Sequence, residues 1–501
     1  MIRKLFGCCC LFALWAGILP AAEPAEAARE HFEAHGPALL AEFAELLQIP
    51  NVASDLPGVT ANARWIERAF EARGAEIEVL SQEGVPPVVW GRLPAPGATR
   101  TLGIYVHYDG QPVDPSQWSQ SPWEPTLYTR SLEDGGKPRP YPAAGDAIDP
   151  EWRIYGRGTS DDRAPLIAWL AAFDALKAAG IERKANLVFL FEGEEEAGSD
   201  HLDAYMEQLG DRLRADLWLI FDGPAHQTRR PQLVFGVRGY TGLDITVYGA
   251  ARYLHSGHYG NWAPNPGLRL AHLLASCKDA EGDVLIEGWN AGGKPPVTDW
   301  KNPPGFEEGL REELGVARSE GGNAPYFERM QIPSFNVRGM QAAGIGDKAR
   351  NVIATEATAS IDIRLVEGND PHEMLDLVEA HVRKQGYRVL HREPTAEERR
   401  KHPMIARIVR RPGYRAVRTS AEQPLTRWLI DTVKGLQPDL VLTPTLGGSL
   451  PLYLFEDRLQ APIVIVPIAN HDNNQHAPDE NMRLGNLLYG IELAATLVAA
   501  D

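Results

Sequence analysis

The chain has 501 residues, 44% of them hydrophobic and 23% charged, which is the composition of a globular protein and excludes a largely disordered one. Its formal net charge of −17 disfavours nucleic acid and anionic membrane surfaces as partners. This length is sufficient for two domains.

The first residues have the layout of a secretory signal peptide. Arg3 and Lys4 precede the apolar run Leu5–Leu19, which leads into the small-residue segment Pro20-Ala21-Ala22. A helix that spans a membrane needs about 20 apolar residues, and this run is shorter. We therefore expect residues 1–22 to be cleaved and the mature protein to be exported, periplasmic or secreted, without membrane attachment.

Cysteine usage is consistent with a fold that has no disulfide framework. Cys8, Cys9 and Cys10 lie in the expected signal peptide, so the mature chain retains only Cys277. An oxidising compartment would permit disulfides, but a single cysteine cannot form one within the chain.

Residues 30–236 alternate strand-like and helix-like segments. Short apolar runs at 102–106, 186–191 and 217–221 predict buried strands. Ala164–Ala179 predicts a helix, because apolar residues recur at three- and four-residue spacing, Pro165 suits the first turn and Gly180 suits the end. This alternation favours an α/β fold with a mainly parallel sheet and helices on both faces.

The pattern changes to a smaller α+β unit near Val237 and returns to α/β character near residue 416. We therefore predict a catalytic domain of residues 23–236 and 416–501, with a lid and dimerisation domain, residues 237–415, inserted into it. The segment 110–152 is too long for a simple connection, and we expect it to be functional or disordered. The later elements are expected at 243–248, 352–366, 371–385, 423–436 and 462–467, with a further helix that begins at the Asn265 cap and Pro266, and a basic stretch covers 399–418.

Histidine and acidic side chains stand beside several of the predicted strands. Ligands of open α/β sheets bind outside the carboxyl ends of the strands, and histidine with carboxylates, without cysteine, is typical of catalytic zinc sites. Each residue alone could belong to a surface turn, a helix cap or a solvated acidic turn, but together they predict a metal site. They are His107, Asp109, Asp161, Asp162, Glu194–Glu196, Asp222 and His476.

These segments resemble a family of metallo-exopeptidases that includes carnosinases, aminoacylases, glutamate carboxypeptidase and succinyl-diaminopimelate desuccinylase. The resemblance covers nearly the whole mature chain, and the carnosinase-like branch is the most similar. The motifs that carry it are Val106–Asp109, Tyr155–Asp162, Glu192–Ser199, Leu254–Gly257 and Gly447–Pro451.

The resemblance implies two divalent ions in each chain, zinc or alternatively manganese or cobalt, with Asp161 as the bridging carboxylate. It also implies a cis peptide bond between Asp161 and Asp162. The other ligands would be His107 and Asp222 for one ion, and Glu196 and His476, in preference to His471, for the other.

The resemblance assigns catalytic roles to three further residues. Asp109 corresponds to the carboxylate that orients the ligand His107. Glu195 corresponds to the general base that takes a proton from the water shared by the metals and later protonates the leaving amine. His255 corresponds to a histidine that reaches from the lid of a partner subunit to stabilise the oxyanion, which implies a homodimer.

Substrate recognition is also implied by the resemblance. Arg364 corresponds to the arginine that binds the substrate carboxylate, and Gly447, Gly448 and Ser449 correspond to a loop whose backbone N–H groups bind the same carboxylate. Thr445-Leu446 and Leu254 depart from the carnosinase-like pattern, so the preferred substrate stays open.

The leading hypothesis is an exported dinuclear metallopeptidase that cleaves the amide bond of a dipeptide or small peptide with a free carboxylate. One alternative is an N-acyl-amino-acid amidohydrolase of the same family. Another is a catalytically silent peptide-binding module, although the presence of the base and of every ligand favours an enzyme.

Overall fold

The computed structural model of the protein describes residues 23–297, 299–322, 324–448 and 450–501. The expected signal peptide, residues 1–22, and Ser449 of the expected substrate loop lie outside the described residues. In the part of the chain that the structure describes, no helix combines the length and apolar character that a membrane span requires.

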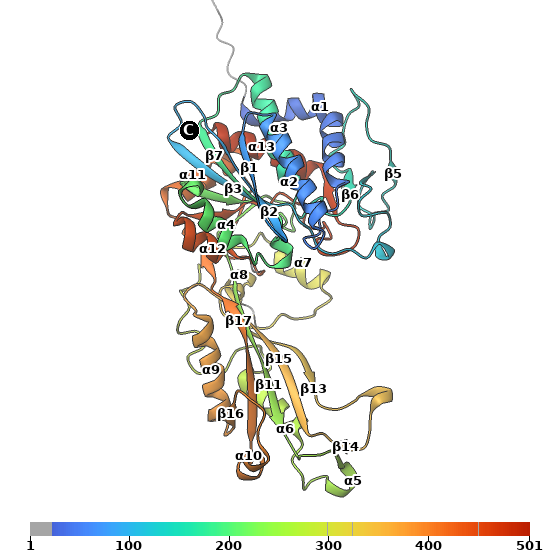
Figure 1. Cartoon of the computed structure of the whole chain (residues 1–501), viewed down its shortest axis with the longest axis vertical. Coiled ribbons are helices and arrows are strands. Elements are labelled where there is room, and N and C mark those ends of the chain that lie inside the picture. The colour runs from blue at the N-terminus through green and yellow to red at the C-terminus, as the bar shows by residue number, and fades with distance from the viewer. Residues whose placement is uncertain (1–22, 298, 323, 449) are drawn as a thin grey trace, which may run out of the picture.

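An eight-stranded sheet forms the upper half of the molecule in Figure 1. Its four central strands run parallel, as the buried apolar runs of the sequence predict, while both flanks include antiparallel pairs. The order is β1 (Glu76–Gln82), β2 (Val85–Leu93), β7 (Ala185–Glu192), β3 (Arg100–His107), β8 (Leu217–Ile220), β20 (Ile463–Ile465), β9 (Gln232–Val234) and β19 (Val441–Thr443).

Helices cover both faces of this sheet, which confirms the predicted fold class. The helix expected at Ala164–Ala179 forms with these bounds as α3, and Gly180 ends it in the left-handed conformation with φ 68°. Its side chains lie in a large apolar core with those of the helices on the same face. That face carries α1 (Pro24–Leu47), α2 (Leu56–Glu71), α3, α11 (Pro424–Leu436) and α13 (Leu484–Ala499), and the other carries α4 (Leu202–Leu209) and α12 (Leu452–Leu459).

The long segment 110–152 is folded and contributes strands to a second, four-stranded sheet. Its apolar side chains Leu127 and Tyr128 are buried. Because β21 joins the same sheet, this segment lies beside the chain that follows His476. The elements are η1 (Pro115–Gln117), β4 (Thr126–Tyr128), β5 (Pro138–Arg139), β6 (Arg153–Tyr155) and β21 (Asn481–Arg483).

The lower half of the molecule in Figure 1 is built on a five-stranded sheet with its own core. Two helices pack on this sheet, and each begins where the sequence provides a cap: the Asn265 side chain accepts the N–H groups of Gly267 and Leu268, and that of Asp370 caps the second helix. The elements are β13 (Ser334–Gln341), β15 (Glu356–Leu365), β11 (Gly239–Tyr248), β17 (Ile405–Tyr414), β16 (Arg388–Leu390), α6 (Pro266–Cys277) and α9 (Pro371–Lys384).

Short elements connect the two halves and close the far end of the lower one. Strands β10 (Gly236–Val237) and β18 (Val417–Arg418) pair with each other where the chain enters and leaves the lower half. Helices α7 (Phe306–Glu313) and α8 (Tyr326–Met330) lie at the junction, whereas α5 (Ser256–Tyr259) lies at the end remote from the large sheet (Figure 1). The remaining elements are β12 (Leu254–His255), β14 (Val352–Ile353), α10 (Ala396–Lys401), η2 (Glu195–Ala197), η3 (Gly210–Leu213) and η4 (Gly346–Lys348).

Candidate metal centre

The residues expected to bind metal meet at the carboxyl-terminal edge of the large sheet. Strands β7, β3, β8 and β20 are parallel neighbours, so the chain segments that follow them converge at one edge. Asp161 joins them from the turn that precedes α3. The convergent residues are His107 at the end of β3, Glu196 in η2 after β7, Asp222 after β8 and His476 after β20.

Asp161 belongs to two groups of possible ligands at once. One carboxylate oxygen, Oδ1, lies 3.0 Å from His107 Nε2. The other, Oδ2, lies 3.1 Å from His476 Nε2. His476 Nε2 lies 3.2 Å from Glu196 Oε2. Within each group the ligand atoms lie within 4.8 Å of one another, and the groups are His107, Asp161 and Asp222, and Asp161, Glu196 and His476.

The electrostatic balance of these groups favours a cation. Burial and the adjacent Asp161 carboxylate raise the pKa of Glu196 to about 7, and burial, with Asp161, raises the pKa of Asp222 to about 6. Although burial opposes it, hydrogen bonds from His107 and His476 hold the pKa of Asp161 below its usual range. The site therefore holds crowded carboxylates whose mutual repulsion a bound cation would offset.

The donor atoms fit a divalent metal ion. Among the described residues Glu196 Oε1 is buried and has no hydrogen-bond partner, whereas its Oε2 accepts the Gln111 amide at 2.7 Å. Histidine nitrogens and carboxylate oxygens without a thiolate suit catalytic zinc, and Cys277 is buried in the core of the lower half. An open carboxylate oxygen within such a set is the feature that a metal ion would satisfy.

The loop that carries His476 has an unusual backbone. His476 lies in the left-handed region at φ 61°, a conformation that is uncommon for residues other than glycine. Such conformations concentrate at functional sites. The structure groups His476, rather than the alternative His471, with the other ligand residues. The peptide bond between Asp161 and Asp162 is cis, as the resemblance implies.

Asp109 contacts more of the site than the sequence predicts. His107 Nδ1 lies 3.2 Å from the Asp109 carbonyl oxygen and 3.5 Å from its carboxylate. That carboxylate also accepts the backbone N–H groups of Glu195 at 3.1 Å and of Glu196 at 3.0 Å. Asp109 therefore links the expected ligand His107 to the turn that carries the expected general base.

The chemistry available to Glu195 follows from its surroundings. Burial, together with the charges of Asp222 and Glu196, raises the pKa of Glu195 well above its ordinary value. Glu195 is in neither group of possible ligands, although its neighbour Glu196 is in one of them. A carboxylate placed beside the ligands without joining them can exchange protons with a reacting group.

Glu480 is a site residue whose role sequence reasoning missed. Its buried carboxylate accepts the backbone N–H groups of Gly158, Ser160 and Asp161 at 2.9–3.0 Å and pairs with the Arg157 guanidinium at 2.8 Å. These contacts fix the turn that presents Asp161. The available signal was the motif His476–Glu480, which places this carboxylate four residues after a ligand.

The residues expected to bind substrate lie in two places. Arg364 is near the end of β15, opposite Tyr240 and Ser334, and its guanidinium lies 5.5 Å from the Tyr240 ring. Gly447 and Gly448 follow Leu446, whose N–H donates to the Gly236 carbonyl at 2.8 Å. Both groups therefore lie where the lower half joins the large sheet.

The structure does not bring His255 to the metal centre of its own chain. His255 is exposed, ends β12 and caps α5, at the end of the lower half remote from the large sheet (Figure 1). Its Nδ1 accepts the N–H of Gly257 at 3.1 Å. A catalytic role for His255 would therefore require a second copy of the chain.

The sequence matches the Peptidase family M20/M25/M40 over residues 103–500. It is 28% identical over 473 residues to the Cys-Gly metallodipeptidase dug1 of Schizosaccharomyces pombe, an alignment that covers 90% of this chain and 93% of that protein. It is 26% identical over 470 residues to the human Beta-Ala-His dipeptidase, covering 89% of this chain and 85% of that protein.

Solved structures show the same fold. The di-peptidase Dug1p from Saccharomyces cerevisiae superposes with a TM-score of 0.69 at 23% identity, covering 95% of this chain and 98% of that one. A metallo-carboxypeptidase from Sulfolobus solfataricus also gives a TM-score of 0.69, at 25% identity, covering 92% and 98%. The chain thus belongs to Peptidase family M20/M25/M40 and is a metal-dependent hydrolase of peptide bonds.

Proposed function

We propose that the protein is an exported dinuclear metallopeptidase that hydrolyses dipeptides or small peptides with a free C-terminal carboxylate. The observation that carries this proposal is Asp161, whose two oxygens contact histidines from two separate groups of ligands. The names of two relatives, a Cys-Gly metallodipeptidase and a Beta-Ala-His dipeptidase, favour dipeptides as the substrate class.

Five side chains would hold two divalent ions, with zinc as the preferred metal and manganese or cobalt as alternatives. His107, Asp161 and Asp222 would hold one, and Asp161, Glu196 and His476 the other. The ions, when bound, supply Lewis acidity toward the scissile carbonyl and make a water molecule more acidic. A site that mixes histidine and carboxylates is the usual composition of catalytic zinc.

Glu195 would transfer a proton from the attacking water to the leaving amine. Its backbone is fixed by Asp109, so its carboxylate is held beside the ligand groups without belonging to either. The raised pKa of Glu195 favours a group that accepts a proton from the attacking water and delivers it to the leaving amine near neutral pH.

Arg364 and the loop of Gly447, Gly448 and Ser449 would bind the substrate carboxylate. A guanidinium can form two parallel hydrogen bonds with a carboxylate, and unhindered backbone N–H groups of glycine can add further ones. The location of Arg364 and of Gly447 and Gly448 at the junction of the two halves supports this role. A carboxylate held there would orient the peptide and restrict the enzyme to chain ends.

His255 would stabilise the oxyanion in the partner subunit of a homodimer. The exposed position of His255 at the remote end of the lower half supports action on another chain. The exposed apolar side chains Val337 and Met340 on the outer strand β13 suit a subunit contact. Residues 237–415 would accordingly serve as the lid and dimerisation domain of a catalytic domain formed by residues 23–236 and 416–501.

Export rests on the sequence of residues 1–22, whose basic start, apolar run and small-residue end are typical of a signal peptide. Expression with and without these residues, followed by cell fractionation and mass determination of the N-terminus, tests this part of the proposal. An uncleaved chain retained inside the cell would contradict it.

The activity is tested on purified protein loaded with zinc, manganese or cobalt and supplied with a panel of dipeptides and N-acyl amino acids. We expect dipeptide hydrolysis, two ions per chain by metal analysis, and loss of both ions from Asp161→Ala. At most one ion in the fully active enzyme, or hydrolysis of N-acyl amino acids in preference to every dipeptide, would contradict the proposal.

A further inference from the structure

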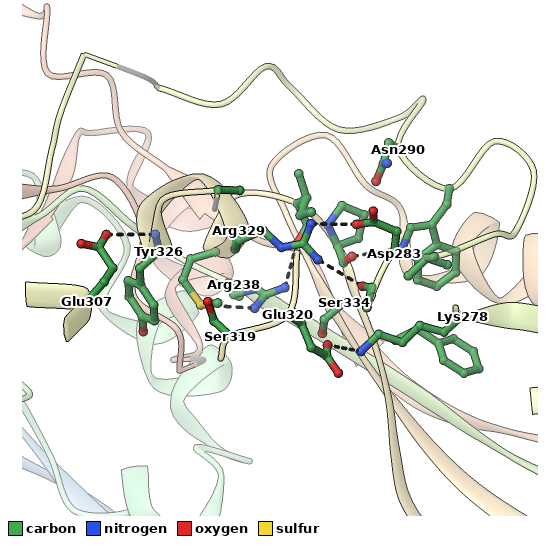
Figure 2. Close-up of a pocket in the computed structure, with 18 of the residues that line it drawn as sticks. Arg238, Lys278, Asp283, Asn290, Glu307, Ser319, Glu320, Tyr326, Arg329 and Ser334 are labelled. Carbon is green, nitrogen blue, oxygen red and sulfur yellow. Dashed lines mark hydrogen bonds and ion pairs between the residues drawn. The ribbon is translucent and has the colours of Figure 1, made fainter. Parts of the chain in front are cut away.

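A cavity of about 350 Å³ lies at the junction, between α8 and the start of the lower sheet (Figure 2). We call it the α8 cavity. Its volume lies in the range of small-molecule sites, which are mostly apolar with a few placed polar groups. The wall contains the side chains of Trp289 and Phe335, whose rings meet edge to face with their centroids 6.0 Å apart, and the polar residues include Arg238, Tyr326 and Arg329.

Arg238 brings into this cavity a positive charge that forms no ion pair among the described residues. It is 4% exposed, and its guanidinium donates to the Ile332 carbonyl at 2.8 Å and, weakly, to Met330 Sδ at 3.8 Å. Among the described residues its buried Nε has no hydrogen-bond partner. Burial, with the nearby charge of Arg364, lowers the pKa of Arg238 to about 10. A buried guanidinium in this state favours an anionic ligand.

Four of the other charged side chains of the α8 cavity form ion pairs with each other, and Arg311, which also lines the cavity, is partly exposed to solvent. Arg329 pairs with Asp283 at 2.9 Å and Lys278 pairs with Glu320 at 2.6 Å, as the dashed lines of Figure 2 mark. Glu307 accepts hydrogen bonds from the Tyr326 N–H and the Asn302 amide, and it lies on the far side of Tyr326 from Arg238 (Figure 2). Because Arg238 is buried whereas Arg311 is partly exposed, Arg238 is the group through which the cavity would bind a carboxylate.

The α8 cavity adjoins the loop proposed to bind the substrate carboxylate. A Cβ atom on Gly447 would lie 3.7 Å from both Tyr326 Oη and Met330 Sδ, two residues of the cavity wall. A second connection runs through Val237, which forms a β-bridge with Leu446 and directly precedes Arg238. A peptide whose terminal carboxylate lay at Gly447 would thus have its C-terminal side chain next to the cavity.

We propose that the α8 cavity is a specificity pocket for a C-terminal residue with a carboxylate side chain, bound by Arg238. The proposal rests on the proposed peptidase function and adds a substrate class to it, namely dipeptides that end in glutamate or aspartate. The apolar wall would contact the methylene groups of the side chain, and the guanidinium would receive its carboxylate.

The test compares Ala-Glu with Ala-Gln, which differ by one charge. We expect kcat/KM of the metal-loaded enzyme to favour Ala-Glu by about 10- to 100-fold, the effect of a hydrogen bond to a charged group. Arg238→Met should remove this preference by raising KM for Ala-Glu alone, and Arg238→Lys should retain part of it. The charge-neutral double variant Lys278→Met/Glu320→Gln alters the same cavity and should keep the preference.

Three results would overturn the proposal: no preference in the wild type, a preference that survives in Arg238→Met, or an equal loss on both dipeptides in a variant whose Tm is unchanged. Free glutarate that binds at Arg238 without competing with Ala-Glu would show instead a separate anion site, and this too would overturn it.

The pocket and the activity can fail separately. If neither dipeptide is hydrolysed, the proposed function fails, and calorimetry on the metal-loaded Glu195→Gln variant then decides about the pocket. A Kd at least about tenfold lower for Ala-Glu than for Ala-Gln, lost on adding Arg238→Met, would support the pocket. Equal Kd values would overturn it.

Discussion

The carboxylate of Asp109 holds the backbone of Glu195 in place, because Oδ1 accepts the Glu195 N–H at 3.1 Å. The second oxygen accepts the N–H of the expected ligand Glu196 at 3.0 Å. A single side chain therefore sets the position of the expected base relative to the expected metal ligands. Its proximity to His107 adds a third connection within the same site.

Asp109→Asn should lower metal affinity by about 10- to 100-fold and reduce turnover, because an amide has one oxygen where the carboxylate uses two. Metal titration followed by activity at saturating metal separates the two effects. Asp200→Asn, an exposed change shortly after η2, is the control. Unchanged affinity and turnover in Asp109→Asn would show that the two N–H contacts do not matter for the site.

Glu195→Gln should retain its metal and its substrate affinity while turnover falls by about 10²- to 10⁴-fold, the usual contribution of a general base. Glu196→Gln should instead lower metal content, because it removes a charged ligand. Glu194→Gln is the matched control in the same turn, since Glu194 pairs with His201 at 2.9 Å. Near-normal turnover in Glu195→Gln would rule out the proposed proton transfer.

Arg364→Ala should raise KM by roughly 10- to 100-fold for dipeptides with a free carboxylate and should matter little for their C-terminal amides. The reason is that only the free carboxylate can form two hydrogen bonds with the guanidinium. Steady-state kinetics on both members of such a pair measure the effect. An equal rise in KM for acid and amide would indicate a structural role for Arg364.

His255→Ala should be inactive as a homodimer and should regain activity when mixed with Glu195→Gln. In a mixed dimer, the intact Glu195 of one chain would meet the intact His255 of its partner. Refolding or co-expressing the two variants and assaying the purified mixed dimer measures this recovery. If His255 acted within its own chain, no mixture of the two variants would exceed their separate activities.

Glu480→Gln should destabilise the metal-free protein by about 3 kcal/mol, because it leaves the buried Arg157 guanidinium without a charged partner. Urea unfolding of the metal-free protein measures the change without a contribution from bound ions. Glu83→Gln, in an exposed turn, is the control and should be close to neutral. A stability equal to that of the wild type would contradict the structural importance of this pair.

Sequence periodicity predicts long buried elements best. The bounds of α3 were predicted correctly because apolar spacing, Pro165 and Gly180 all agree. The strands within 110–152 are not predicted, since β4 and β5 have only three and two residues and depend on pairing with one another. The basic stretch 399–418 contains the whole of β17, where Arg410 and Arg411 pair with acidic residues of other elements.

Some site residues can be predicted from the sequence, whereas others are recognised only in the folded chain. Residues that bind metal have a characteristic chemistry, so His107, Asp161 and His476 could be proposed from their types and motifs. Glu480 has the chemistry of any surface acid, and its contacts with Gly158 and Asp161 join positions about 320 residues apart. Arg238 is similar, because only the folded chain places it in a cavity without a carboxylate partner among the described residues.

The pairing of β10 with β18 has a consequence for how this chain can be rearranged. Gly236 lies opposite Arg418 and Val237 lies opposite Val417. The chain therefore enters and leaves the lower half on two adjacent, paired strands. The chain between β10 and β18 thus acts as one very long loop that connects two paired strands. The entropy cost of closing such a loop rises only logarithmically with its length. A short turn joining these two strands should therefore leave the large sheet able to fold alone, and the lower half could be exchanged between relatives as a cassette.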